Sequence, residues 1–367
     1  IIPAFLDNEV DILDETLTSY TKLVCEENIY VVLVYNTKKD MKDEENLLFY
    51  KWDKKQFRDG KITINIVKNK LSTSKAHNVN FVTSKLDHEI FPYVGIMDAD
   101  HFPEPSNATK VLDTFSSKGY DIVQGVCSIR NHDNFLSRVV AVEFDEMYCV
   151  GHEGRFGLFN LGLFAGSNGF WKTKVLKDVG MDTTMLTEDI DSSIRALLGG
   201  YKVGFSAEII TSELSPMTRT THAKQRKRWS QGWLQVSLKH FLSCLRSQKM
   251  SWRQRIGICY LLGWREYFTY FTFWPLICTI SVYLDGYVTF DVLFITIGGL
   301  IFSLGLVKSC VTYALAKGPI KQKMGVGPFI VFLLVTVFYS MYIYFIQIVS
   351  HGRHLLNMNT WVATTRD

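Results

Sequence analysis

The chain has 367 residues, of which 47% are hydrophobic, 14% aromatic and only 21% charged, with a formal net charge of +4. This composition excludes a disordered chain, and a single basic cluster near residue 226 does not indicate a nucleic-acid partner. The length suits two domains. The composition is uneven, since residues 1 to about 230 have mixed charge, whereas long apolar runs begin near residue 260.

Seven cysteines are scattered along the chain, and no Cys-x-x-Cys pair occurs. An odd number of dispersed cysteines is typical of reduced thiols, so we expect the charged part of the chain to face a reducing compartment. The sequence opens at Ile1 inside an apolar segment, without a charged leader or an initiator Met. We therefore expect that it was trimmed at its N-terminus.

Strand-like and helix-like segments alternate over the first 130 residues or so. The expected strands are residues 1–5, 29–35, 61–67, 93–97 and 121–129, and the expected helices are residues 10–24, 45–57, 74–86 and 105–119. Ser74 is placed to cap the third helix, and Gly119 is placed to end the fourth. This alternation predicts an α/β domain with a mostly parallel sheet, in which ligands bind at the carboxyl ends of the strands.

Three long apolar stretches follow, at residues 261–284, 292–316 and 327–349. Each reaches the ~18 residues needed to span a hydrocarbon core, and buried helices of a large soluble protein are the alternative. The loop at 285–291 is acidic and that at 317–323 is basic, so the positive-inside rule predicts a multi-pass membrane protein with its first half in the cytoplasm. The third stretch either spans the bilayer or bends back as a surface helix.

These features divide the chain into three parts. Residues 1–230 form the α/β domain, residues 231–260 form amphipathic helices at the lipid bilayer surface, and residues 261–367 form a transmembrane region with a cytoplasmic C-terminal segment. The basic, apolar-spaced run around the junction is the reason for expecting surface helices there.

Asp98 and Asp100 directly follow the expected strand at 93–97. Taken alone, such a pair is more often a loop end or a helix cap. Because residues i and i+2 of a strand point to the same face, both carboxylates converge on one site if the strand persists. Carboxylate oxygens suit Mg²⁺ or Mn²⁺, and such an ion neutralises a diphosphate leaving group.

A second acidic group follows Thr187 and contains Glu188, Asp189 and Asp191. One interpretation is structural, with Thr187 capping a helix whose first turn favours acids. The other is catalytic, with Asp189 as a general base that takes a proton from an acceptor hydroxyl.

A basic cluster at residues 225–229 reads Gln-Arg-Lys-Arg-Trp. On a helix, Gln225, Arg228 and Trp229 share one face, where the guanidinium can clamp a diphosphate and the indole can support a sugar ring. Arg226 and Lys227 point elsewhere, and we expect them to meet lipid headgroups. A basic membrane anchor is the alternative for the whole cluster.

The run at residues 166–171, Gly-Ser-Asn-Gly-Phe-Trp, contains small residues that permit close backbone approach. Asn168 is a candidate for binding a hydroxyl group. A simple turn is the alternative.

Together, the order Asp-Ala-Asp, Ser-Asn-Gly, Thr-Glu-Asp, Gln-x-x-Arg-Trp and apolar stretches resembles the membrane-embedded family 2 glycosyltransferases, which include cellulose, chitin and hyaluronan synthases. The resemblance covers nearly the whole chain. Residues 1–9 resemble the opening strand and nucleotide-binding turn of that family, which places Pro3 near the donor, and residues 72–80 resemble a segment that places Lys75 there. Residues 361–366 resemble its C-terminal cytoplasmic segment near the active site.

The resemblance implies a GT-A-like nucleotide-sugar-binding domain and a role for each matching residue. Asp98 contacts the nucleotide, and Asp100 contacts the metal and the diphosphate, with Asp98 as a second metal ligand. Asp189 is the base. Gln225 and Arg228 hold the diphosphate, Trp229 bears the acceptor sugar, and Glu188 is a supporting neighbour of the base. Apart from the resemblance, Asn168 and Glu188 are candidate acceptor-binding residues.

One residue departs from the family pattern. The second strand of the family commonly ends in an acid that reads the uracil base, but Asn36 stands there in this chain and Asp40 follows further on. We expect Asn36 to contact the base, since an amide also pairs with a pyrimidine edge.

The resulting hypothesis is an inverting, Mg²⁺- or Mn²⁺-dependent transferase. It moves a hexose or N-acetylhexosamine from a UDP-sugar to a growing β-linked polysaccharide or oligosaccharide at the membrane. A lipid-linked sugar transferase with a polyprenyl-phosphate or glycolipid acceptor is one alternative. A non-catalytic membrane transport or scaffold protein is the other.

Overall fold

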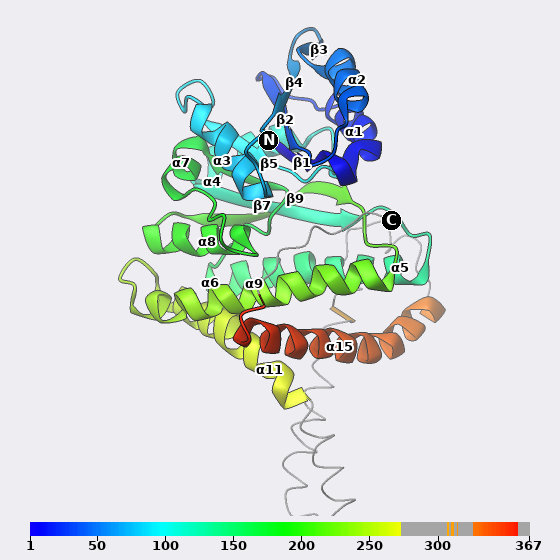
Figure 1. Ribbon diagram of the computed structural model, residues 1–367. Helices are drawn as coiled ribbons and strands as arrows, with labels where there is room; N and C mark the ends of the chain where they lie inside the picture. The colour runs from blue at the N-terminus through cyan, green and yellow to red at the C-terminus, as the bar shows by residue number, and fades with distance from the viewer. Residues whose placement is uncertain (273–306, 308–309, 312–313, 315–325, 359–367) are drawn as a thin grey trace, which may run out of the picture.

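The structure is a computed structural model that describes residues 1–272, 307, 310–311, 314 and 326–358. In Figure 1 the strands and their flanking helices occupy the upper part of the molecule. Helices α9 (Arg219–Arg246) and α15 (Val326–Leu355) run side by side beneath them. The expected α/β domain is therefore present.

The first sheet has the order β1-β2-β4-β3. Strands β1 (Ile2–Phe5), β2 (Ile29–Asn36) and β4 (Ile62–Lys68) are parallel, as expected, and helices α1 (Leu6–Tyr20) and α2 (Lys42–Trp52) belong to the same part of the chain. Strand β3 (Lys55–Phe57) pairs antiparallel with β4, although the sequence predicted a helix there. The helix ends at Trp52 because Lys54 adopts a φ of 56°, which a right-handed helix does not allow.

The second sheet has the order β5-β8-β7-β9-β6 and corrects the prediction of a mostly parallel sheet. Only β7 (Ile122–Ile129) and β9 (Val203–Glu213) are parallel. Strand β8 (Gly169–Lys172) runs antiparallel between β5 (Tyr93–Ile96) and β7, and β6 (Phe102–Pro103) runs antiparallel to β9. The chain thus enters β8 beside Ile96, where β5 ends, and beside Gln124 of β7, and it brings the loop at 163–168 to that place.

The two sheets meet at Ile1. Its amino group donates a hydrogen bond to the carbonyl of Gly95 (2.7 Å), and its carbonyl accepts one from Met97 N–H (3.0 Å). The hydrophobic clusters of the two sheets are nevertheless largely different. One cluster contains Leu33 and Ile64 of the first sheet, together with Met97 and Ala99 after β5. Three others lie around the second sheet, and one of these contains Trp171 with residues of α8 and α9.

The remaining helices of the α/β domain connect and cover the second sheet. They are α3 (Lys75–Lys85), α4 (Asn107–Lys118), α5 (Phe135–Asp145), the π-helix η1 (Glu146–His152), α6 (Glu153–Phe159), α7 (Thr173–Val179) and α8 (Glu188–Gly199). Two predicted helix signals are confirmed, because the Ser74 side chain accepts from His77 N–H (3.3 Å) and Gly119 ends α4 with a φ of 64°.

After α9 the chain continues through α10 (Trp252–Ile258), the π-helix η2 (Cys259–Trp264) and α11 (Arg265–Thr272). The expected boundary at residue 230 falls inside α9, which is one helix of 28 residues. The six cysteines that the structure describes are free thiols.

The described residues contain no helix that is both long enough and apolar enough to cross a membrane, so a transmembrane C-terminal region is not supported. The stretch at 327–349 falls within α15, which packs along α9 and carries polar contacts, such as His351 Nε2 with Glu266 Oε2 (3.1 Å). Residues 273–284 of the first stretch, most of the stretch at 292–316 and the segment at 361–366 lie outside the described residues.

A buried carboxylate fastens α8 to α9. Asp191 of α8 is fully buried and accepts from Arg195 Nε (2.7 Å), Lys239 Nζ (3.0 Å) and His240 Nε2 (2.7 Å). Burial alone would raise the pKa of Asp191, but these three hydrogen bonds hold the pKa below its usual value. The carboxylate is therefore ionised and well compensated. We call these four residues the Asp191 network.

Replacing Asp191 with Ala should lower the free energy of unfolding by about 1–3 kcal/mol, because it leaves the buried His240 without its acceptor and removes the anionic partner of the partly exposed Arg195 and Lys239. Denaturant titration measures the change. Asp178→Ala is the control, since Asp178 is exposed and accepts a hydrogen bond from Tyr201 Oη (2.9 Å). Equal stability of the two variants would contradict a role of the Asp191 network in holding the helices together.

Candidate active site

A cavity of about 700 Å³ opens where β1, β2, β5 and β9 end, and the N-terminus of α8 and one face of α9 close it. All but one of the predicted site residues line it. They are Pro3, Asn36, Lys75, Asp98, Asp100, Glu188, Asp189, Gln225, Arg228 and Trp229. The structure thus brings together residues that are separated by more than 200 positions in sequence.

Asn36 stands at the end of β2 and is held by a neighbouring amide. Its Oδ1 accepts from Asn78 Nδ2 (3.0 Å), and Asn78 Oδ1 accepts from Asn69 Nδ2 (3.2 Å). Because its acceptor oxygen is engaged, Asn36 presents its amide N–H groups to a ligand.

Asp98 and Asp100 lie in a turn rather than in a strand, since β5 ends at Ile96 and His101 N–H bonds to the Asp98 carbonyl (3.1 Å). The expected strand geometry is therefore wrong, yet both carboxylates reach the cavity. Asp98 pairs with Lys75, whose ammonium also donates to the Gly166 carbonyl (2.7 Å).

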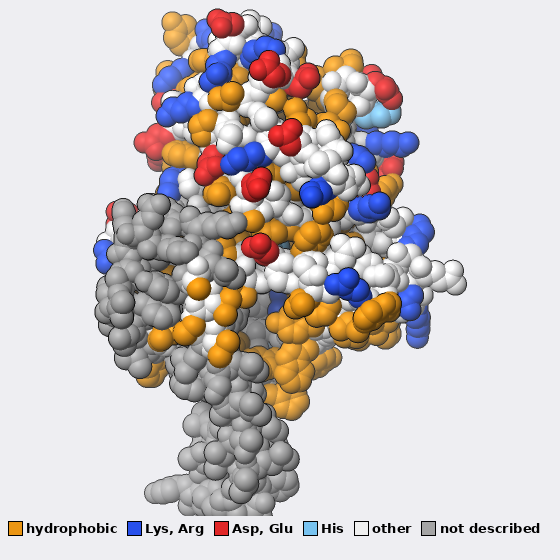
Figure 2. All heavy atoms as spheres, turned by 180° about the vertical axis from the view of Figure 1, so that it is seen from behind, with side chains coloured by type: hydrophobic (Ala, Val, Ile, Leu, Met, Phe, Trp, Pro, Cys, Tyr) orange, Lys and Arg blue, Asp and Glu red, His pale blue; other side chains and the backbone are white. Residues whose placement is uncertain are grey.

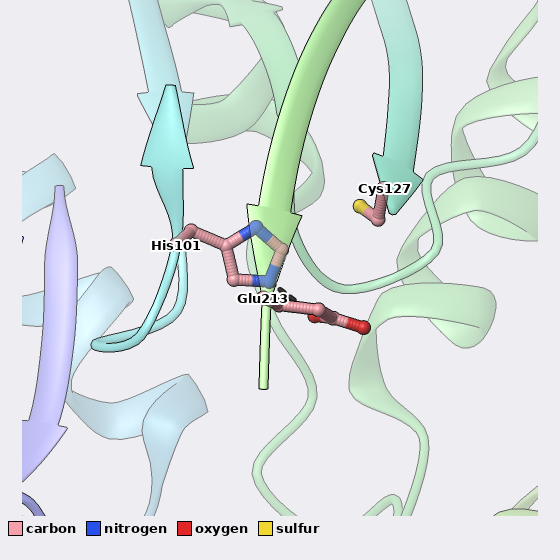
Figure 3. Close-up of side chains that lie close together, drawn as sticks. All are labelled: His101, Cys127 and Glu213. Carbon is pink, nitrogen blue, oxygen red and sulfur yellow. Dashed lines mark hydrogen bonds and ion pairs between the residues drawn. The ribbon is translucent and has the colours of Figure 1, made fainter. Parts of the chain in front are cut away.

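The sequence interpretation missed a third carboxylate. Figure 3 shows His101 after β5, Cys127 on β7 and Glu213 at the end of β9 lying close together. Glu213 lines the cavity and pairs with the fully buried His101, whose other ring nitrogen contacts Thr211 Oγ1 (3.0 Å). A His directly after Asp100 was the available sequence signal, but its partner is 112 residues away.

The ligand atoms of His101, Cys127 and Glu213 lie within 4.8 Å of one another, which is compatible with a metal ion. However, burial raises the pKa of the Cys127 thiol well above its usual value, so the sulfur stays protonated. Since His101 and Glu213 already pair with each other, we interpret this group as a hydrogen-bonded support beneath Asp100.

The carboxylates of Asp98, Asp100 and Glu213, which line the cavity, are the other candidates for holding a divalent cation. Asp100 is almost completely buried and accepts from Leu214 N–H (3.0 Å). Burial raises the pKa of Glu213, and the negative charges of Asp100 and Asp98 raise it further against the effect of His101. Such crowded carboxylate oxygens are the ligands that Mg²⁺ and Mn²⁺ prefer.

Asp189 lies in the first turn of α8, facing the cavity. Burial and the neighbouring Glu188 charge raise its pKa to about 7, although Lys75 and Arg228 act in the opposite direction. The close approach of Gly166 is possible only without a side chain, because a Cβ there would lie 2.7 Å from Asp189 Oδ2. A carboxylate that titrates near neutral pH is suited to general-base chemistry.

The structure does not support the capping interpretation of Thr187. Its hydroxyl makes no hydrogen bond with the part of the chain that the structure describes, and no side-chain cap is present at the start of α8. Thr187 lies against α9 at Gly232, where a Cβ atom would lie only 2.5 Å from Thr187 Cγ2. The absence of a side chain at Gly232 lets α9 approach the first turn of α8.

Gln225, Arg228 and Trp229 line the cavity from one face of α9, as their spacing predicts. Arg228 donates a long hydrogen bond to the Leu186 carbonyl (3.5 Å). The expectation that Arg226 meets lipid headgroups is wrong, because its side chain is buried and paired with Glu143 of α5. Lys227, which lies between Arg226 and Arg228 in the sequence, is exposed.

Asn168 is the predicted residue that the structure does not bring to the cavity. Its side chain is fully buried, and its amide donates to the carbonyls of Val126 (2.9 Å) and Ile209 (3.1 Å). With a φ of 50°, it anchors the loop before β8 to the neighbouring strands. An amide in a Gly-rich loop carried no signal that distinguishes this role from hydroxyl binding.

Comparison with known families agrees with this geometry. Residues 93–349 match the model of glycosyl transferase family group 2, and residues 1–180 match that of glycosyl transferase family 2. The protein belongs to the family 2 glycosyltransferases.

Two curated relatives indicate the range of the family. The chain is 27% identical over 195 residues to a cellulose synthase of Dictyostelium discoideum that is named as UDP-forming, and the match covers 50% of this chain and 18% of the relative. It is 26% identical over 248 residues to the poly-β-1,6-N-acetyl-D-glucosamine synthase of a Staphylococcus epidermidis strain, covering 66% and 57%. The chain thus spans less than two thirds of the length of each relative.

Among solved structures, the chain is similar to the mannosyltransferase PcManGT from Pyrobaculum calidifontis in complex with GDP-Man and Mn²⁺. The TM-score is 0.54 at 13% identity, and the match covers 98% of this chain and 86% of the other. This likeness supports a GT-A-like α/β fold with a mixed sheet.

The raised pKa of Asp189 predicts an acidic limb near pH 7 in the profile of kcat/KM for glycosyl transfer, because only the deprotonated carboxylate accepts a proton. Glu188→Gln removes a negative charge that raises this pKa, so the limb should move to lower pH. A pH–rate series on both proteins measures the shift. A limb that stays in place or moves upward would contradict the assignment.

Proposed function

We propose that the protein is an inverting glycosyltransferase that moves a hexose or an N-acetylhexosamine from a UDP-sugar to a β-linked saccharide. The observation that carries the proposal is the position of Asp189, a carboxylate with a pKa of about 7, in one cavity with Lys75, Arg228 and the carboxylates of Asp98 and Asp100. A base and a diphosphate site side by side are what sugar transfer requires.

The end of the cavity at β1 and β2 suits the nucleotide. Pro3 and Asn36 line it, and the Asn36 amide is available to donate to a carbonyl of a pyrimidine base. The relative from Dictyostelium is named as UDP-forming, which supports a uridine donor. Lys75 and Arg228 provide positive charge for the diphosphate, and the planar fork of arginine suits paired phosphate oxygens.

The reaction is a single displacement. An acceptor hydroxyl gives its proton to the Asp189 carboxylate, and its oxygen forms a bond with the anomeric carbon of the donor. The bond between that carbon and the diphosphate oxygen breaks, and the nucleoside diphosphate leaves with the electron pair. One displacement inverts the anomeric centre, so an α-linked donor gives a β-linkage.

Asp98 and Asp100 are the residues that would hold Mg²⁺ or Mn²⁺, with Glu213 close by. When bound, such an ion supplies Lewis-acid stabilisation of the negative charge on the leaving diphosphate. The solved mannosyltransferase of similar fold was obtained with Mn²⁺, which supports this assignment without distinguishing the two ions.

The acceptor end favours a saccharide. Trp229 and Trp233 line the cavity one helical turn apart on α9, where their rings can pack against successive sugar rings. The two curated relatives are named as polysaccharide synthases, which supports an extended acceptor. A polyprenyl-phosphate acceptor offers no series of sugar rings to pack against the two tryptophans, so the lipid-linked transferase is the second candidate.

We also propose that the apolar end of the molecule lies at a lipid bilayer, with the catalytic domain in the cytoplasm. Figure 2 shows hydrophobic side chains gathered at the end that carries α11. The exposed aromatic residues there include Trp252, Trp264, Tyr267 and Phe271. Tryptophan and tyrosine are the side chains most favoured at a membrane interface.

The membrane proposal predicts that the protein binds lipid vesicles and that replacing Trp252 and Trp264 with Ser weakens binding about tenfold or more. Co-flotation with phosphatidylcholine–phosphatidylserine vesicles measures this. Replacement of the exposed Tyr50 and Leu71 with Ser is the control, because neither residue belongs to α10, η2 or α11. Unchanged flotation of the tryptophan variant would reject this surface.

Asp189→Asn should reduce transfer by at least about 100-fold, since the amide cannot take the proton, while UDP binding stays near the wild-type value. Each labelled UDP-sugar is tested in turn with Mg²⁺ or Mn²⁺, with and without chelator, and the product linkage is determined. Retained transfer by Asp189→Asn would exclude this residue as the base. A single glycolipid product would favour the lipid-linked alternative, and absence of any turnover would favour a non-catalytic protein.

A further inference from the structure

Arg226 contacts two residues of the site without lining the cavity itself. Its side chain is only 4% exposed, and one terminal N–H donates to Gln225 Oε1 (3.0 Å). The guanidinium also lies over the ring of Trp229, 4.2 Å from its centroid. Arg226 therefore touches both the proposed diphosphate ligand and the proposed acceptor platform.

An anionic partner keeps this buried guanidinium charged. Arg226 pairs with Glu143 of α5, which also accepts from Tyr339 Oη of α15 (2.6 Å). Burial alone would lower the pKa of Arg226, but Glu143 more than offsets this and raises it. Since a buried charge pair is costly unless its geometry is well satisfied, Arg226 has little freedom to move.

A neutral histidine of α9 adds further hydrogen bonds between α9 and α15. His222 is fully buried, with Nε2 3.0 Å from Tyr339 Oη and Nδ1 3.5 Å from Tyr342 Oη. Burial and the positive charge of Arg226 lower the pKa of His222 to about 3. Because Tyr339 donates its single proton to Glu143, His222 donates from Nε2 to Tyr339 and accepts from Tyr342 at Nδ1.

The contacts of Arg226 determine what its two neighbours offer to a ligand. A glutamine that binds a diphosphate must present its N–H₂ group, and Arg226 secures this orientation by engaging the Gln225 oxygen. The guanidinium covers one face of the Trp229 ring, which leaves the other face for a sugar.

We propose that Arg226 is a positioning residue for sugar transfer, fixing the amide orientation of Gln225 and the ring of Trp229, and that α15 holds it in place through Tyr339 and Glu143. This inference rests on the proposed function, which gives Gln225 and Trp229 their roles. It makes α15 a part of the active-site framework, although none of the residues of α15 lines the cavity among those that the structure describes.

Arg226→Lys tests the proposal, because a lysine keeps the charge but cannot bind Glu143 and Gln225 while stacking on Trp229. We expect the acceptor KM to rise about tenfold, UDP affinity measured by calorimetry to fall several-fold, and the thermal midpoint to change little. Arg253→Lys is the matched control, since Arg253 is exposed and donates to the carbonyls of Gly157 and Leu158, which do not line the cavity. Wild-type KM and UDP affinity in Arg226→Lys would overturn the proposal.

Tyr339→Phe tests the contribution of α15 and serves as the second variant should Arg226→Lys fail to fold. It removes only the hydroxyl that donates to Glu143, so it should raise the acceptor KM about threefold. Tyr50→Phe is its control, because Tyr50 is exposed. An unchanged KM in Tyr339→Phe would overturn the link to α15.

The measurement of UDP binding distinguishes a failure of the proposed function from a failure of the positioning role of Arg226. If the wild type binds UDP but transfers no sugar, the proposed function fails. Weaker UDP binding by Arg226→Lys would then still support the positioning of Gln225. If the wild type transfers sugar and both variants behave as their controls, the proposed function stands and the positioning role fails.

Discussion

The contact between α8 and α9 is the constraint on which the site depends. The Asp191 network fastens the two helices with an ionised, fully buried carboxylate and three donors. Gly232 permits their close approach, since any side chain there would collide with Thr187. Because α8 carries Asp189 in its first turn and α9 carries Arg228, this contact fixes the position of the proposed base relative to the proposed diphosphate ligand.

The charges of the cavity depend on that contact in turn. Burial and Glu188 raise the pKa of Asp189, whereas Lys75 and Arg228 limit the rise. Moving α9 away would withdraw Arg228 and raise the pKa of Asp189 further. The packing of the two helices therefore influences the pKa of Asp189. Glu213 and the two acids after β5 form a second group of negative charges.

Local patterns were sufficient to predict much of this structure. Strand-like segments located β1, β2, β4, β5 and β7, Ser74 and Gly119 marked helix ends, and the i, i+3, i+4 spacing placed Gln225, Arg228 and Trp229 on one face. The interpretation of Asp98 and Asp100 reached the correct cavity although the strand ended earlier than expected.

The remaining features depend on partners distant in sequence. Arg226 looked like a surface cation because Glu143 lies 83 residues away, and Asn168 looked like a ligand because the carbonyls that it binds belong to other strands. The antiparallel course of β8 is set by the position of its neighbours, which its short apolar run does not encode. A local sequence pattern therefore predicts least well the role of a buried polar group, because its partners are distant in sequence.

The separation of the hydrophobic clusters has a consequence for substrate preference. The proposed nucleotide end of the cavity lies at the cluster of the first sheet, whereas Trp229 and Trp233 at the proposed acceptor end pack against clusters of the second. A change of packing beneath the proposed nucleotide end therefore involves few of the side chains that support the proposed acceptor end. We expect donor preference and acceptor preference to vary with different sets of buried residues, and Asn36 ends the strand that carries the first set.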